Sequence, residues 1–458
     1  MTREDRLYRI RQKLELVAKA DPAYSVFGSK AHQYKLNDPL ILAEVERFEQ
    51  EHGIKLPESY VDFVTELGNG GAGPYYGIHR LGAKQAIDLD LIGQPSALNP
   101  RNKLDVSGWS EDGLADDCVD DEEEKYPGLL NIGEQGCSYE TMLMITGDYR
   151  GKVIYIDLDS QKTFFTYEAN FLDWYERWLD ETIAGYESAW FGMRRGGDDL
   201  ELMELYRSST EQRIHIEALE GMLKLPNIAD DTVGFLLQEY HECSGEVRRW
   251  ALQVLAKMRF NEAEPLIREM LRSPDGTNRL LALQLIKWYM PEGDQRFTRE
   301  LVDMVALEND GEAFRLLTMI LREAEVEMLP LMLPFFKHVD KDIRIQALYQ
   351  AGNSTVTQKA EQLHHFIAAL DDTEVYVQLI ALQALRGVTD PRLLEVFEQL
   401  LERHKTNKDY IRSNVWVLLE EFPFRSLEQV EREIPSSLRQ VKGILKKKLM
   451  EFMKNEGK

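Results

Sequence analysis

Only a few residues of this chain have the types and spacing that chemistry requires. The glycine cluster from Gly68 to Gly73 could cradle a phosphate group through backbone N–H groups. A phosphate loop follows a strand, opens a helix and contains Gly-Lys-Ser/Thr. This cluster instead closes a predicted helix and lacks the lysine. We therefore expect it to end that helix and turn the chain.

Histidine and cysteine are too scattered to predict a metal site. His241 is close to Cys243, and His365 directly follows His364, but the chain has no HExxH motif and no zinc-type spacing. Adjacent residues on a helix point about 100° apart, so His364 and His365 could not easily share a metal ion. We assign no metal ligand and no cofactor.

Cys137 is the remaining candidate for chemistry, as a nucleophile that follows the turn from Gly133 to Gly136. The sequence has no GxSxG motif, no Cys/His pattern of a known protease family and no dinucleotide-binding fingerprint. Carboxylates are too abundant to single out an acid–base pair. We assign no catalytic residue and expect no enzyme activity.

Charge points instead to a protein partner. The chain has 79 acidic and 55 basic residues, which gives a net charge of −24. This balance disfavours binding to nucleic acid or to an anionic membrane and suits a basic protein. The stretch from Gly93 to Pro127 contains the densest run and is either a solvated loop or a partner-binding surface. The candidate partner-binding residues are Asp116, Asp117, Asp120, Asp121, Glu122, Glu123 and Glu124.

Cysteine usage and hydropathy indicate the cytoplasm. Cys118, Cys137 and Cys243 are far apart and form no disulfide framework, which fits a reducing compartment. The charged N-terminus lacks the apolar core of a signal peptide. No run approaches the roughly 20 apolar residues needed to cross a bilayer.

The stretch from Leu42 to Tyr76 predicts two short helices. The first has an apolar stripe and ends at Gly53, with Asp38 and Pro39 expected as its N-cap and first residue. Pro57 opens the second helix, and glycines end it. The buried face of the second helix is expected to contain Tyr60, Phe63, Val64 and Leu67.

Strands and a closing helix follow. Gly77 to Leu91 is expected to form short strands, because apolar residues partly alternate with polar ones. Further strands are predicted at Leu129 to Ile132, Glu140 to Thr146, Lys152 to Asp157 and Thr163 to Tyr167. Aromatic residues at helical spacing predict a helix from Phe171 to Leu179, and an amphipathic helix is predicted from Arg3 to Lys19.

These blocks resemble the signature of the SUKH superfamily, the Smi/Knr type. The first block fits LPxxYxxFxxxLxNGG, and the second fits an IGxxGC turn, a GxVyxxD strand and an sFxdWxexwL helix. The matching residues are Leu56, Pro57, Tyr60, Phe63, Asn69, Gly70, Gly71, Gly133, Gly136, Cys137 and Trp174. The resemblance implies an α+β binding domain in which Cys137 lies in a tight turn and is buried as a small hydrophobic residue. The stretch from Gly93 to Pro127 departs from the pattern as an insertion.

From about Leu200 onward, strand signals vanish and one helical motif recurs. Each copy has a small residue in the middle of an apolar face, with Arg or another polar residue three or four positions earlier. The aligned residues are Ala218, Ala251, Ala282, Ala347, Ala381 and Val415. They are 31 to 34 residues apart, except for a gap of 65 that leaves room for a weaker copy at Phe314 to Thr318. This period resembles that of short HEAT-type repeats, in which helix pairs stack.

The predicted organisation is therefore a SUKH-type α+β domain with a mostly antiparallel sheet and flanking helices, followed by an all-α HEAT-like solenoid. We place the first domain at residues 1–190, a linker at 191–199, the repeats at 200–440 and a basic C-terminal helix or tail at 441–458.

The resemblance also implies a function. Many bacterial SUKH proteins resemble immunity proteins, which bind and neutralise a toxin, often a nuclease. We expect a non-catalytic protein that blocks a basic toxin sterically and electrostatically. The alternative is a regulatory or structural scaffold that binds cellular proteins through its repeats. A solenoid enzyme resembling bilin lyases is a third hypothesis, for which the chain offers no residue to carry chemistry.

Overall fold

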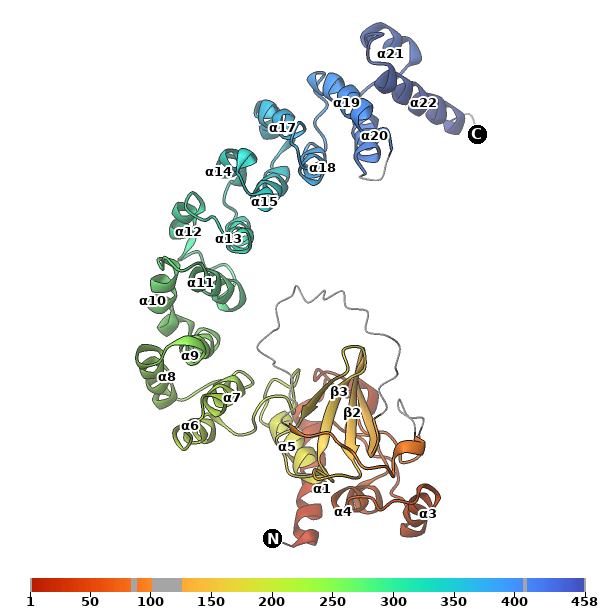
Figure 1. The fold of residues 1–458 in the computed structure, drawn as a ribbon, viewed down its shortest axis with the longest axis vertical. Helices are drawn as coiled ribbons and strands as arrows, with labels where there is room; N and C mark the ends of the chain where they lie inside the picture. Colours follow the sequence, from red (N-terminus) through yellow and green to blue (C-terminus); the bar gives the residue numbers. More distant parts are fainter. Residues whose placement is uncertain (1, 84–88, 101–125, 407–409, 457–458) are drawn as a thin grey trace. The chain divides into compact units, whose positions relative to one another are not determined.

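The computed structural model describes residues 2–83, 89–100, 126–406 and 410–456 (Figure 1). The chain divides into two compact units, Met1–Arg259 and Phe260–Lys458, which we call the first and the second unit. Among the described residues, every helix is too short or too polar to span a lipid bilayer.

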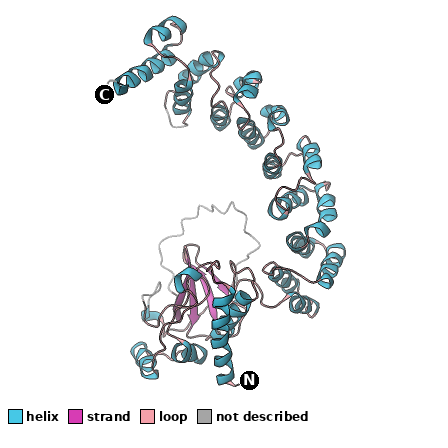
Figure 2. Cartoon of the chain, turned by 180° about the vertical axis from the view of Figure 1, so that it is seen from behind, coloured by secondary structure: helices cyan, strands magenta, loops and turns pink. Residues whose placement is uncertain are grey.

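A four-stranded antiparallel sheet forms the centre of the α+β part of the first unit (Figure 2). Its strands are β1 (Leu129–Gly136), β2 (Tyr139–Met144), β3 (Val153–Asp157) and β4 (Lys162–Phe165), and each pairs with the next in the order of the chain. The register of β1 and β2 shifts between Asn131 and Gly133 and between Glu134 and Gly136. These bulges lengthen β1 beyond the predicted end at Ile132 and bring the β1–β2 turn to Cys137.

Both faces of the sheet are buried. One face belongs to a core that also takes in the apolar sides of α1 (Arg3–Ala20) and α5 (Phe171–Ile183). Trp174 and Tyr175 of α5 are at most 1 % exposed in this core. The other face carries Met142, Ile154 and Phe165, with Tyr149 packed against them. Because both faces are apolar, successive strand residues are buried rather than alternating with exposed ones.

The predicted pair of short helices is present. It consists of α3 (Leu42–His52), which Gly53 ends with a φ of 63°, and α4 (Glu58–Asp62), which continues as the short π-helix η1 (Phe63–Leu67). A third helix, α2 (Ser29–His32), precedes them. The prediction that Asp38 and Pro39 open α3 is wrong, because Ile41 is the N-cap. The Asp38 carbonyl instead accepts from Asn69 N–H at 3.3 Å, which holds this segment beside the glycine turn.

The predicted short strands between Gly77 and Leu91 are also replaced by other structure. Ile78 forms one isolated bridge with Gly71, and Leu89–Leu91 is a 3₁₀ turn (η2). The backbone N–H of Leu81 donates to the Asn69 side chain at 2.8 Å, which turns the chain instead of extending it. Residues 84–88 lie outside the described residues.

The rest of the described chain is helical. The first unit continues with α6 (Asp199–Arg207), α7 (Gln212–Met222), α8 (Asp230–Glu242) and α9 (Gly245–Met258). Contacts join α6 to α7, α7 to α9 and α8 to α9, so these helices form two stacked pairs. The aligned residues Ala218 and Ala251 are fully buried, which allows α7 and α9 to approach closely.

A buried junction fixes these pairs to the α+β part within the first unit. Lys224 is 2 % exposed, and its Nζ donates to the carbonyls of Arg195 at 2.7 Å and Gly197 at 2.9 Å. The same nitrogen lies 3.5 Å from the carboxylate of Glu181 on α5. Arg195 in turn pairs with Glu217 of α7 at 2.7 Å. Buried charges that are paired in this way hold two elements in one arrangement.

The second unit repeats the pairing. Its outer helices are α10 (Phe260–Leu271), α12 (Thr298–Val305), α14 (Met328–Met332) with the 3₁₀ turn η5 (Leu333–Lys337), α16 (Val356–Glu361), α17 (Leu363–Ala369) and α19 (Arg392–Arg403). Its inner row is α11 (Gly276–Tyr289), α13 (Gly311–Glu323), α15 (Lys341–Gly352), α18 (Val375–Ala384) and α20 (Ile411–Glu421). The inner helices contact one another in sequence, as Figure 1 shows. Helices α21 (Leu427–Glu433) and α22 (Arg439–Glu456) close the unit.

The small-residue motif falls on the inner row. Ala282, Ala347, Ala381 and Val415 are fully buried on α11, α15, α18 and α20. The expected weaker copy is α13, where Phe314 is also fully buried. The fold class is confirmed: an α+β part with an antiparallel sheet is followed by stacked helix pairs, as in an all-α solenoid.

Polar residues near the start of the inner helices tie successive pairs together. The Arg279 guanidinium makes two bonds to Glu308, at 2.8 and 2.9 Å, just before α13. Arg344 pairs with Asp372 at 2.8 Å, just before α18, and Arg412 lies 3.3 Å from Gln440 of α22. The Arg noticed in the sequence motif therefore joins each of these helices to the next pair. We call these contacts the arginine ladder.

Candidate protein-binding site

The N-terminal signature residues are structural. Tyr60 and Phe63 are at most 1 % exposed, and their rings lie 5.1 and 5.0 Å from that of Phe171. Trp174 donates its indole N–H to the Tyr155 hydroxyl at 2.9 Å. Leu56 is buried and donates its backbone N–H to the Glu49 carboxylate at 2.9 Å. Pro57 follows as the N-cap of α4.

The glycines of the signature allow close contact between backbone segments. Gly70 and Gly71 have φ of 78° and 105°. A Cβ atom on Gly71 would lie 2.5 Å from the Lys35 carbonyl, and one on Gly133 would lie 2.7 Å from the Gly77 carbonyl. The Asn69 side chain accepts from Leu81, so it braces the turn rather than facing a ligand. A side chain at either glycine would therefore collide with the backbone of a neighbouring segment.

Cys137 corrects one expectation. It lies in the tight β1–β2 turn as expected, but it is exposed rather than buried. Gly136 and Cys137 have φ of 93° and 52°, and two successive left-handed residues direct the chain around the outside of the hairpin. Cys243 is half-buried, and burial raises the pKa of its thiol.

Hydrogen bonds connect three polar side chains at the sheet. His79 Nδ1 donates to Asn131 Oδ1 at 2.9 Å, and Asn131 Nδ2 donates to Glu140 at 2.7 Å. Burial raises the pKa of Glu140. Asn131 therefore lies between the two titratable groups, His79 and Glu140. Over the described ranges, His, Cys, Asp and Glu side chains form no group of three that could hold a metal ion.

The sequence did not reveal an exposed aromatic pair beside this turn. Phe27 and Tyr76 are 51 % and 41 % exposed, and their ring centroids lie 5.4 Å apart. The Tyr76 ring lies 3.1 Å from the position of a Cβ on Gly136. Exposed aromatic rings are enriched among residues that anchor protein interfaces. We call Phe27, Tyr76 and the Gly136–Cys137 turn the aromatic patch.

The acidic run is the other candidate partner-binding surface. All of its candidate residues lie outside the described residues: Asp116, Asp117, Asp120, Asp121, Glu122, Glu123 and Glu124.

Comparison with known families gives one match. Residues 39–177 match a model of the SMI1 / KNR4 family (SUKH-1). We call them the SUKH-1 segment. The segment contains all the signature residues, the four strands and most of α5. No curated protein matches the chain. Tyr76 and Cys137 of the aromatic patch lie within the SUKH-1 segment, whereas Phe27 precedes it.

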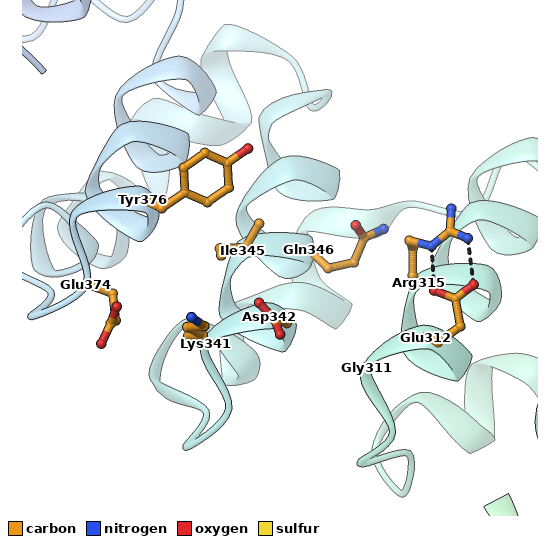
Figure 3. Close-up of a pocket in the computed structure, with 9 residues that line it drawn as sticks. All are labelled: Gly311, Glu312, Arg315, Lys341, Asp342, Ile345, Gln346, Glu374 and Tyr376. Atoms are coloured by element: carbon orange, nitrogen blue, oxygen red, sulfur yellow. Dashed lines mark hydrogen bonds and ion pairs between the residues drawn. The ribbon is translucent and has the colours of Figure 1, made fainter. Parts of the chain in front are cut away.

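A second candidate surface lies on the second unit and was also missed. A groove of about 490 Å³ crosses the inner helices α13, α15 and α18 (Figure 3). We call it the inner-row groove. Its floor and walls are Gly311, Glu312, Arg315, Lys341, Asp342, Ile345, Gln346, Glu374 and Tyr376. A sequence motif of small buried residues locates the helices but not the exposed residues between them.

Proposed function

We propose that this protein is a non-catalytic, immunity-type binding protein that neutralises a toxin in the cytoplasm. The match of residues 39–177 to the SMI1 / KNR4 family (SUKH-1) is the observation that carries the proposal. In this proposal the helix pairs are HEAT-like repeats that extend the binding surface. Inhibition requires only that the bound protein covers the toxin's active site.

Charge and surface chemistry support a basic partner, such as a nuclease domain. A net charge of −24 speeds association with a positively charged protein. The aromatic patch supplies apolar area within the same part of the chain as the SUKH-1 segment. Electrostatic attraction would set the association rate, and buried aromatic contacts would hold the complex.

The test is co-expression with toxin-like proteins encoded by neighbouring genes. We expect growth to be rescued by this protein and a complex to be recovered by co-purification. The double variant Phe27→Ala and Tyr76→Ala should lose rescue, because interface aromatic residues often account for more than about 1 kcal/mol of binding each. Tyr8→Ala is a matched control, since Tyr8 is 61 % exposed on α1. Failure of every neighbouring toxin to bind the wild-type protein would refute the proposal.

A further inference from the structure

The inner-row groove has one apolar and one charged side. Figure 3 shows Tyr376 of α18 reaching toward Ile345 of α15, with Gln346 on the side facing α13. Tyr376 is 58 % exposed, so most of its side chain is accessible to a ligand. An aliphatic side chain of a ligand could therefore bury surface against Tyr376 and Ile345.

Carboxylates outnumber cations on the other side. Glu312 is neutralised by Arg315, which makes bonds of 2.9 and 2.6 Å to it. Asp342 and Glu374 are exposed, and within the described parts of the chain neither forms an ion pair. The N-cap residues Asp310 and Asp340 add further negative charge at the starts of α13 and α15. Lys341 is the cation that remains on this edge.

Helix capping explains Asp310 and Asp340 but does not explain the whole arrangement. The Asp310 and Asp340 side chains accept backbone N–H groups of their own helices. Asp342 and Glu374 have no such bond among the described residues, and they lie on consecutive inner helices around the same groove as Tyr376. A groove with an aromatic wall and unpaired carboxylates is complementary to a ligand with aliphatic and basic side chains.

We propose that the inner-row groove binds an extended, basic segment of a partner protein. One aliphatic side chain packs on Tyr376 and Ile345, and flanking Lys or Arg side chains lie beside Asp342 and Glu374. Neighbouring helices pack about 8–10 Å apart, so the span from α13 to α18 is about 20 Å. An extended chain covers this distance with about six residues.

This inference concerns the second unit alone and does not rest on toxin neutralisation. A toxin that binds through the SUKH-1 segment would leave it untouched, and a peptide that binds the groove would not identify a toxin.

Fluorescence anisotropy with the full chain and a labelled peptide tests the site. The probe is a peptide of about seven residues in which Arg alternates with Leu. The comparison peptide has Glu at each Arg position. At about 0.15 M salt, where long-range attraction is largely screened, we expect the basic peptide to bind and the acidic peptide not to bind. Tyr376→Ala should weaken binding roughly tenfold, as removal of an aromatic anchor does.

Matched charge variants separate the groove from the general acidity of the chain. The double variant Asp342→Asn and Glu374→Gln should weaken binding roughly tenfold, since it removes both unpaired carboxylates. Glu361→Gln with Glu395→Gln changes the net charge equally on the outer helices α16 and α19, where both side chains are exposed. This control should change the affinity by less than about twofold.

A variant that binds the peptide more tightly cannot owe that effect to unfolding. Lys341→Glu should tighten binding of the basic peptide several-fold, whereas Lys337→Glu on η5 should not. The proposal is overturned if the acidic peptide binds as well as the basic one. It is equally overturned if the outer-helix pair weakens binding as much as the groove pair, or if Tyr376→Ala has no effect.

Discussion

His32 is a titratable side chain enclosed by aromatic rings. Its ring centroid lies 5.4 Å from that of Tyr34 and 5.9 Å from that of Trp178. Its Nδ1 accepts the backbone N–H of Tyr34 at 3.0 Å, which requires the neutral form at that nitrogen. Burial lowers the pKa of His32 to about 4. The core therefore keeps this imidazole uncharged at neutral pH.

Acidification should destabilise the first unit through His32. The pKa in the folded chain lies below the ordinary value of about 6.5, so the unfolded chain takes up the proton first as pH falls. Stability is therefore complete above about pH 6.5 and decreases toward about pH 4. Urea unfolding of the wild type and of His32→Asn should show a shallower loss for the variant between these values. An unchanged slope would show that other groups cause the acid sensitivity.

At the residue scale, the burial of a side chain was predictable where apolar residues recur at helical spacing. Tyr60, Phe63 and Trp174 are buried as their periodicity indicates. Cys137 was assigned wrongly, because the left-handed backbone of Gly136 and Cys137 determines its exposure and hydrophobicity does not. The exposure of Tyr76 also could not be predicted, since an aromatic residue after a glycine turn has no pattern that distinguishes core from surface.

Elements were predictable where local signals agreed with tertiary contacts. Strands β2 to β4 and helices α1, α3 and α5 lie close to their predicted ranges. The start of α3 and the segment after Gly77 differ, because bonds to the glycine turn from residues distant in sequence override local capping and alternation. The inner helices were predictable because one small residue recurs at each helix crossing.

At the scale of elements, the buried Lys224 should make the stability of the first unit depend on pH. Burial lowers the pKa of Lys224 to about 8, below the unfolded value of about 10.4. The unfolded chain then holds more protons between these values, so the folded state gains stability as pH rises through this window. Lys224→Met should remove that gain. Thermal unfolding of both proteins from about pH 8 to about pH 9.5 measures it, below the range in which tyrosines ionise.

An equal rise in melting temperature for wild type and Lys224→Met would contradict this prediction. Lys287→Met is a suitable control, because the Lys287 ammonium forms its ion pair with Glu323 at the surface of the second unit.

At the scale of the whole molecule, the boundary between the two compact units does not coincide with the change in sequence character. Strand signals end before about residue 200, but helices α6 to α9 belong to the same compact unit as the sheet. Lys224, which follows α7, illustrates the reason, since its Nζ donates to the Arg195 and Gly197 carbonyls and lies 3.5 Å from the Glu181 carboxylate of α5. Sequence periodicity identifies repeats but does not show how firmly the first of them is attached to its neighbour.

Truncation should reveal this attachment. A chain of residues 1–259 retains the whole junction, so we expect a single urea transition close to that of the first unit in the full chain. A chain of residues 1–190 loses the Arg194 carbonyl and Lys224, which leaves Arg177 and Glu181 with fewer partners. It should unfold at a clearly lower urea concentration. Equal midpoints for the two chains would show that the sheet and its helices are stable without the junction.

The arginine ladder also constrains how this protein can change in length. Arg279 and Arg344 each reach an acidic residue 29 or 28 positions further along the chain. Loss of a single helix would separate an arginine from its acidic partner and leave both charges without that contact. Removal of a whole pair would instead keep each remaining helix packed against a helix of the equivalent position. Natural variants of the second unit should therefore differ by complete helical pairs, and duplication of the stretch from Gly276 to Glu308 would add a second Arg–Glu contact of this kind.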